Sequence, residues 1–244
     1  MFSKKTNLAL QITFILLLLI ECLLIYKSKY TNYSYVRMLA SVILFVYVFS
    51  REGFKRMRLY YYIGLTFCVA ADVLTIFLYN SFFYIGMTLF TLAYVAFANI
   101  MYRTREIKDR KNIPPVLITI LIVVALLDLI YYYVPTVTDA VSYIQIGFHI
   151  LILAIIMVWS IKGSRRKKAN TPYFLIASII IVLANITYFV DIQILLRKHP
   201  SVDALVVLLH GLYLLVLAKG INDFKNFSDP SEGNLESKRH RSRK

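Results

Sequence analysis

Charged residues are scarce in this chain, and their scarcity excludes an ordinary soluble domain. Only 17% of the 244 residues are Asp, Glu, Lys or Arg, whereas 59% are hydrophobic, and the mean hydropathy is +0.66. A typical water-soluble domain carries about 25% charged residues. The composition therefore predicts a polytopic membrane protein.

Cysteine, histidine and lysine are also rare within the apolar runs, and each shortage excludes a class of site. Cys22 and Cys68 match neither a disulfide framework nor a metal motif. A zinc hydrolase needs about three clustered ligands, but the runs contain only His149 and His210. Lys219 lies at the end of the last run, which argues against a retinal pigment. We predict no metal and no other cofactor.

Long apolar runs, in contrast, are abundant. A transmembrane helix needs about 20 mostly apolar residues, and eight segments are candidates, of which the second is the weakest because it is short and carries Arg37 at its start. These segments cover residues 8–26, 36–50, 59–79, 82–102, 115–134, 140–161, 173–196 and 203–219. We predict an all-α bundle of eight transmembrane helices within residues 1–222, followed by a disordered basic cytoplasmic tail at residues 223–244.

Basic residues outnumber acidic ones, 28 against 13, and most lie on one side of the predicted membrane. If the N-terminus is cytoplasmic, only five basic residues belong to outer segments: Lys27, Lys29, Arg37, Arg197 and Lys198. This asymmetry follows the positive-inside rule and predicts that both termini are cytoplasmic in a bacterial plasma membrane. We expect the basic loops and tail to contact anionic lipids, and we predict no nucleic-acid partner.

Four polar residues recur at similar depth within these runs. Glu21, Asp72, Asp128 and Asn185 are 51, 56 and 57 residues apart, and each lies about two-thirds along its run. An ionisable side chain in hydrocarbon costs roughly 2.5–3.5 kcal/mol on insertion scales, so these residues predict a polar pocket inside the bundle. Alternatively, the aspartates make structural hydrogen bonds between helices, and Glu21 snorkels to the membrane surface or pairs with Lys27.

The chain also repeats a helix pair. Residues 81–93 (SFFYIGMTLFTLA) align without gaps on residues 142–154 (SYIQIGFHILILA). Each repeat unit contains an outgoing helix with a carboxylate or amide and a helix that returns inward. Transporters also use such repeats, so the repetition alone does not distinguish an enzyme from a carrier.

Other side chains are predicted to line the pocket. Residues three or four apart share a helix face, which places Thr75 beside Asp72 and Tyr188 beside Asn185. The other candidates are Tyr94, His149, His210 and Tyr213. The alternative for the histidines is a hydrogen-bonded core position, and the alternative for Tyr94 is packing.

Two stretches, AADVLTIF at residues 70–77 and FYIGMTLFTLAYVAF at residues 83–97, resemble the YhhN-like lysoplasmalogenase family. The family pattern is Gly-Asp followed by Phe-x-x-Gly-x-x-x-Phe-x-x-x-His-x-x-Tyr. Asp72, Phe83, Gly86 and Phe90 match it, whereas Ala71, Tyr94 and Phe97 depart from it. A second family block, Ser followed by Asp or sometimes Asn, is similar to Ala184 and Asn185.

The resemblance implies an integral membrane hydrolase that cleaves the vinyl ether bond of lysoplasmalogens to a fatty aldehyde and a glycerophospho-headgroup. This hydrolysis begins with a proton transfer to the β-carbon, for which a carboxyl group in a weakly polar site is suitable. We expect Asp72 to be the acid and Asp128 to stabilise the cation or activate water, with Asn185 and His210 orienting the water.

A carrier or a bundle that binds lipid or another small ligand without catalysis is the alternative function. Transporters often interrupt helices with Gly and Pro at the binding site. Here Pro114, Pro115, Pro135, Pro172 and Pro200 lie at the ends of predicted spans, and no span is visibly broken. This pattern favours the hydrolase.

Overall fold

Seven helices make up the part of the chain that the structure, a computed structural model, describes. The described residues are 3–27, 30–49, 55–77, 83–104, 140–164, 172–193 and 199–224. The helices are α1 (Lys4–Tyr26), α2 (Tyr30–Phe49), α3 (Lys55–Phe77), α4 (Phe83–Thr104), α6 (Ala140–Ser164), α7 (Pro172–Gln193) and α8 (Pro200–Asp223). The all-α prediction is confirmed for these ranges, which contain no strand.

The predicted eight-helix count is not confirmed. The fifth predicted span, residues 115–134, lies outside the described residues. Residues 225–244, which make up most of the predicted tail, also lie outside them. Of the described helices, α1, α3, α4, α6, α7 and α8 are long and apolar enough to cross a membrane. In α2 the apolar stretch, Tyr35–Phe49, is shorter, which agrees with its prediction as a weak span.

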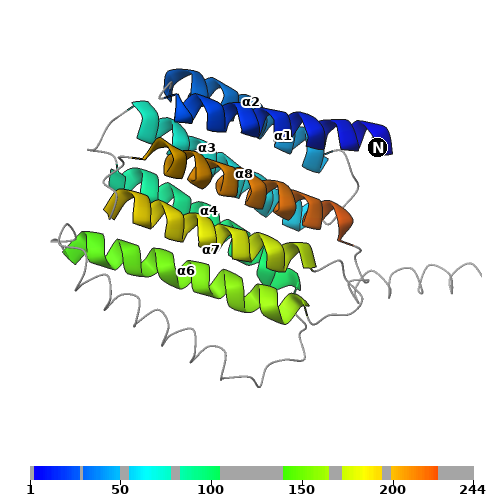
Figure 1. Ribbon diagram of the computed structural model, residues 1–244. Coiled ribbons are helices and arrows are strands. Elements are labelled where there is room, and N and C mark those ends of the chain that lie inside the picture. The colour runs from blue at the N-terminus through cyan, green and yellow to red at the C-terminus, as the bar shows by residue number, and fades with distance from the viewer. Residues whose placement is uncertain are drawn as a thin grey trace, which may run out of the picture.

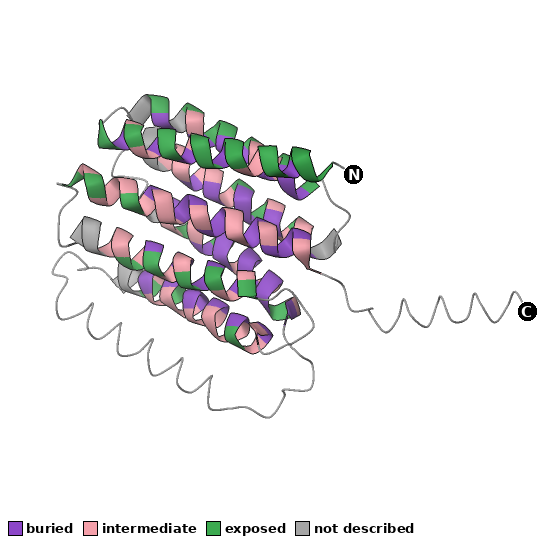
Figure 2. Cartoon of the chain, turned by 45° about the vertical axis from the view of Figure 1, so that its right-hand side comes forward, coloured by how far each residue is buried: buried purple, intermediate pink, exposed green. Residues whose placement is uncertain are grey.

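The outer surface of the bundle is apolar, as an integral membrane protein requires. Large side chains such as Leu16 and Leu23 of α1 are more than half exposed. Figure 2 shows exposed positions along the outer side of α1 and buried positions where the helices meet. In lipid an exposed leucine carries no penalty, and each helix satisfies its own backbone hydrogen bonds. The chain is therefore an integral membrane protein.

The helices lie side by side in a layered bundle with α8 near its middle (Figure 1). Helix α8 packs against α7, α1, α2 and α3, while α4 packs against α3 and α6. The interior is rich in aromatic rings: the Phe97 ring lies 6.2 Å from that of Tyr61 and 6.0 Å from that of Tyr213. The central helix thus brings together side chains from both ends of the chain.

Glycine permits two of the close helix contacts. A Cβ atom at Gly64 of α3 would overlap the ring of Phe97 on α4, and one at Gly211 of α8 would overlap the side chain of Leu18 on α1. Small residues at such contacts let membrane helices approach closely, which increases van der Waals packing where no hydrophobic driving force exists between helices.

Helix α2 begins at Tyr30, earlier than the predicted residue 36. Arg37 lies within the helix and is 4% exposed, so it belongs to the interior of the bundle and not to a loop. The physical reason is that Arg37 has ion-pair partners inside the bundle, and these partners offset the cost of removing its charge from water.

Candidate functional site

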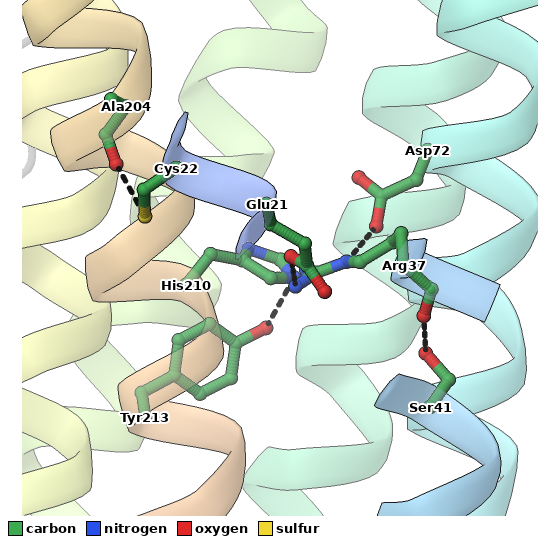
Figure 3. Close-up of polar contacts among 8 residues, drawn as sticks. All are labelled: Glu21, Cys22, Arg37, Ser41, Asp72, Ala204, His210 and Tyr213. Atoms are coloured by element: carbon green, nitrogen blue, oxygen red, sulfur yellow. Dashed lines mark hydrogen bonds and ion pairs between the residues drawn. The ribbon is translucent and has the colours of Figure 1, made fainter. Parts of the chain in front are cut away.

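Arg37 joins two of the predicted pocket carboxylates. Its Nε donates a hydrogen bond to Asp72 Oδ2 at 2.9 Å, and its Nη1 donates to Glu21 Oε2 at 3.2 Å. Figure 3 shows the guanidinium between the two acids, which come from α1 and α3. Glu21 is completely buried. The three residues form a charged cluster inside the bundle, and we call it the Arg37 cluster.

The Arg37 cluster leaves one carboxylate oxygen without a partner. Glu21 Oε1 is buried and has no hydrogen-bond partner among the described residues. A buried polar atom without a partner costs about 1–3 kcal/mol. In addition, two carboxylates and one guanidinium carry an excess negative charge, which is unfavourable in an apolar interior. One proton on the pair of acids would remove the excess charge, so this cluster is suited to holding a transferable proton.

Helix α8 contributes His210 and Tyr213 to the same region, as Figure 3 shows. The Tyr213 hydroxyl lies 3.5 Å from His210 Nε2 and 3.5 Å from Cys68 Sγ. The His210 ring packs edge-on against the Phe90 ring at 5.4 Å. His210 and Tyr213 therefore border the Arg37 cluster.

A second polar group centres on Asn185 of α7. Its Oδ1 lies 2.9 Å from His149 Nε2, and its Nδ2 donates to the Tyr94 hydroxyl at 3.0 Å and to the Ile181 carbonyl at 2.7 Å. His149 Nδ1 lies 2.7 Å from Thr91 Oγ1. We call these residues of α4, α6 and α7 the Asn185 network.

Tyr94 connects the Asn185 network to the residues on α8. The rings of Tyr94 and Tyr213 meet edge to face at 6.4 Å. A band of polar side chains thus extends from Thr91 to Glu21, with members on all seven described helices. In a bundle with an apolar exterior, this band is where substrate chemistry is possible.

The comparison with known families agrees with the resemblance seen in the sequence. The model of the YhhN family matches residues 32–221. This chain belongs to the YhhN family. The matched region contains Arg37 and Asp72 as well as the whole Asn185 network, whereas Glu21 precedes it. No curated protein and no solved structure matches the chain significantly.

Seven of the predicted site residues lie within the polar band of this YhhN-family chain. They are Glu21, Asp72, Tyr94, His149, Asn185, His210 and Tyr213. Asp128 and the side chain of Thr75 lie outside the described residues. Tyr188 is half-buried on α7. The roles of Asp128, Thr75 and Tyr188 stay predictions.

The sequence reasoning missed Arg37 and Thr91. The signal for Arg37 was present, because an arginine in a marginal span next to intramembrane carboxylates has a strong reason to pair with them. Thr91 had no signal of its own, since threonine is common in membrane helices and commonly bonds to a backbone carbonyl.

Proposed function

We propose that this YhhN-family protein is an integral membrane hydrolase that cleaves the vinyl ether bond of lysoplasmalogen-type lipids. The products are a fatty aldehyde and a glycerophospho-headgroup. The observation that carries the proposal is the buried Arg37 cluster, with two carboxylates around one guanidinium and an unpartnered oxygen on Glu21. The family resemblance supports the substrate class, and the cluster supports the acid and base chemistry.

The reaction requires one acid that later acts as a base. Proton transfer to the β-carbon of the vinyl ether produces an oxocarbenium ion, and water adds to this ion. The water returns a proton to the carboxylate, and the resulting hemiacetal collapses to the aldehyde and the headgroup alcohol. A pair of carboxylates with one shared proton can perform both transfers. The second, ionised carboxylate stabilises the cation between them.

Geometry supports different roles for the two acids. Glu21 Oε1 is without a partner, so a proton on this atom is available for transfer to substrate. Asp72 accepts a hydrogen bond from Arg37 Nε at 2.9 Å, and an arginine-bonded carboxylate is stabilised in its ionised form. In this proposal Glu21 donates the proton and Asp72 stabilises the cation.

Aldehyde release by the purified protein tests the proposal. The substrate is a 1-alkenyl lysophosphatidylethanolamine, and the control lipids carry a saturated 1-alkyl ether or a 1-acyl ester. We expect aldehyde only from the alkenyl lipid. Glu21→Gln and Asp72→Asn should each lower kcat by about 100-fold or more, as expected for loss of a general acid or base.

A matched control is Asp223→Asn. Asp223 is the last residue of α8, about 20 Å along the helix from His210 at 1.5 Å per residue. This variant should retain full turnover. Absence of turnover by the unmodified protein, or full turnover by both Glu21→Gln and Asp72→Asn, would remove the proposal. Loss in Asp72→Asn alone would instead assign the acid to Asp72.

A carrier receives less support from the described helices. Carriers built from repeats usually bind their solute where helices are broken. Each of the seven described helices is continuous over 20 to 25 residues. The polar side chains of the band therefore project from regular helices.

A further inference from the structure

The orientation of the Asn185 side chain follows from one backbone contact. Asn185 Nδ2 lies 2.7 Å from the carbonyl oxygen of Ile181. A carbonyl oxygen only accepts hydrogen bonds, so the amide nitrogen must face it. The amide oxygen then faces His149 Nε2 at 2.9 Å.

This orientation determines the tautomer of His149. Asn185 Oδ1 cannot donate a hydrogen bond, so His149 Nε2 must carry a hydrogen. His149 is buried, and none of the ion pairs among the described residues includes it. A buried imidazolium without a counter-ion is costly, so the ring is neutral and Nδ1 is an acceptor.

The neutral ring in turn directs the Thr91 hydroxyl. Thr91 Oγ1 lies 2.7 Å from His149 Nδ1 and 2.8 Å from the Met87 carbonyl oxygen. Both are acceptors, but the hydroxyl has a single hydrogen. His149 Nδ1 has no hydrogen of its own, so the Thr91 hydrogen bonds to Nδ1.

The other end of the network controls Tyr94. Asn185 uses its second N–H to bond the Tyr94 oxygen at 3.0 Å. The Tyr94 hydrogen must therefore point away from Asn185, and the Tyr213 ring meets the Tyr94 ring edge to face at 6.4 Å. Tyr213 in turn lies 3.5 Å from His210 at the border of the Arg37 cluster.

We propose that Thr91, His149 and Asn185 form a one-directional chain of hydrogen bonds that positions the Tyr94 hydroxyl as a donor directed away from Asn185. Asn185 is then a positioning residue, and an amide is required because a carboxylate has no N–H for Tyr94. The chain of bonds follows from geometry, and only its effect on turnover rests on the hydrolase function proposed above.

Nitrogen-15 NMR of histidine in the purified full-length protein tests the hydrogen-bond chain. The chain has four histidines, and a His149→Gln variant identifies the signals of His149. We expect the neutral tautomer with hydrogen on Nε2. Thr91→Val should shift the Nδ1 signal without changing the tautomer. Asn185→Asp should place a carboxylate against Nε2 and convert the ring to an imidazolium.

Two matched variants serve as controls for these spectra. Asn99 of α4 donates to the Val95 carbonyl at 2.9 Å, as Asn185 does to Ile181, and Thr66 of α3 donates to the Tyr62 carbonyl at 2.9 Å from an exposed position. Asn99→Asp and Thr66→Val should leave the His149 signals unchanged. A hydrogen on Nδ1 alone, or an imidazolium in the unmodified protein, would overturn the proposal.

Kinetics separate positioning from simple loss of fold. Asn185→Ala and Tyr94→Phe should each lower kcat on the alkenyl lysolipid by about 10- to 100-fold with little change in KM, as expected for misplacement of a group at the reacting centre. The double variant should lose no more than either single variant, because both remove the same donor.

The outcomes distinguish this inference from the proposed function. If the unmodified protein releases no aldehyde, the hydrolase proposal fails, whereas the His149 tautomer still tests the hydrogen-bond chain. If aldehyde is released but Asn185→Ala and Tyr94→Phe reduce kcat additively, the two residues act independently and the positioning role of Asn185 is wrong.

Discussion

Arg37 Nε of α2 lies 2.9 Å from Asp72 Oδ2 of α3, and the same guanidinium reaches Glu21 of α1. This contact joins the described helix with the shortest apolar stretch to two helices that are long and apolar enough to cross a membrane. The apolar stretch of α2, Tyr35–Phe49, is short for a transmembrane helix. The ion pairs therefore hold α2 in the bundle and at the same time create the charged centre of the candidate site.

Removal of the arginine charge should destabilise the bundle strongly. Arg37→Gln removes the counter-charge that Glu21 and Asp72 share inside the bundle, and breaking a buried ion pair in this way typically costs about 3–5 kcal/mol. Unfolding by denaturing detergent from mild-detergent micelles measures the effect. Adding Glu21→Gln and Asp72→Asn to the same protein should restore most of the lost stability. A triple variant as unstable as Arg37→Gln alone would contradict this explanation.

The planar guanidinium group of Arg37 should also be important for turnover. Arg37→Lys keeps a positive charge but replaces a planar group with five donors by a compact ammonium. We expect Arg37→Lys to remain folded and to release aldehyde more slowly than the unmodified protein, since one ammonium cannot hold both acids in the same geometry. Aldehyde release with a parallel unfolding measurement checks this. An unchanged kcat would show that turnover requires a positive charge at position 37 but not the geometry of a guanidinium group.

Two neighbouring tyrosines of α3 should respond differently to loss of the hydroxyl. Tyr61 donates to the Leu214 carbonyl of α8 at 3.1 Å, whereas the Tyr62 hydroxyl is buried without a partner among the described residues. Tyr61→Phe should cost about 0.5–1.5 kcal/mol of unfolding free energy. Tyr62→Phe should be neutral or stabilising, because it removes an unsatisfied polar atom. Equal effects in unfolding titrations would argue against the α3–α8 hydrogen bond.

Glycine at position 64 should be required for the α3–α4 contact. A Cβ atom there would lie 2.7 Å from Phe97 Cζ, and a ring atom cannot move without the whole ring. Gly64→Ala should therefore destabilise by about 1–3 kcal/mol, the usual cost of overpacking. Gly211→Ala should cost less, because it meets the flexible end of Leu18. Thermal unfolding measures both, and Phe97→Leu should rescue Gly64→Ala.

Much of the fold was predictable because the membrane imposes strong local rules. Apolar runs of about 20 residues predict spans, and the described helices coincide with seven of the eight predicted spans. The depth of Glu21, Asp72 and Asn185 along their runs also follows from residue position alone. These features depend on composition over one helix length, so they do not require knowledge of the neighbours.

The partners of the polar residues were harder to predict. Residues on one helix face can be grouped by their spacing, which paired Asn185 with Tyr188. In the structure Asn185 bonds to the Ile181 carbonyl of its own helix and to two side chains of other helices, namely His149 at 2.9 Å and Tyr94 at 3.0 Å. Spacing along one helix cannot give the rotation of a neighbouring helix, which depends on packing of all their side chains.

The amino-acid sequence by itself determined that this protein is a helical membrane protein with polar residues at matched depth inside it, because hydrophobicity over 20 residues and the cost of buried charge act locally. Only the tertiary structure decided that Arg37 is inside the bundle and bonded to Glu21 and Asp72. It also decided which donor faces which acceptor around Asn185. These choices depend on how α1, α2 and α3 pack around Arg37 and how α4, α6 and α7 pack around Asn185, since a buried charge or polar group is tolerated only where a neighbouring helix supplies its partner.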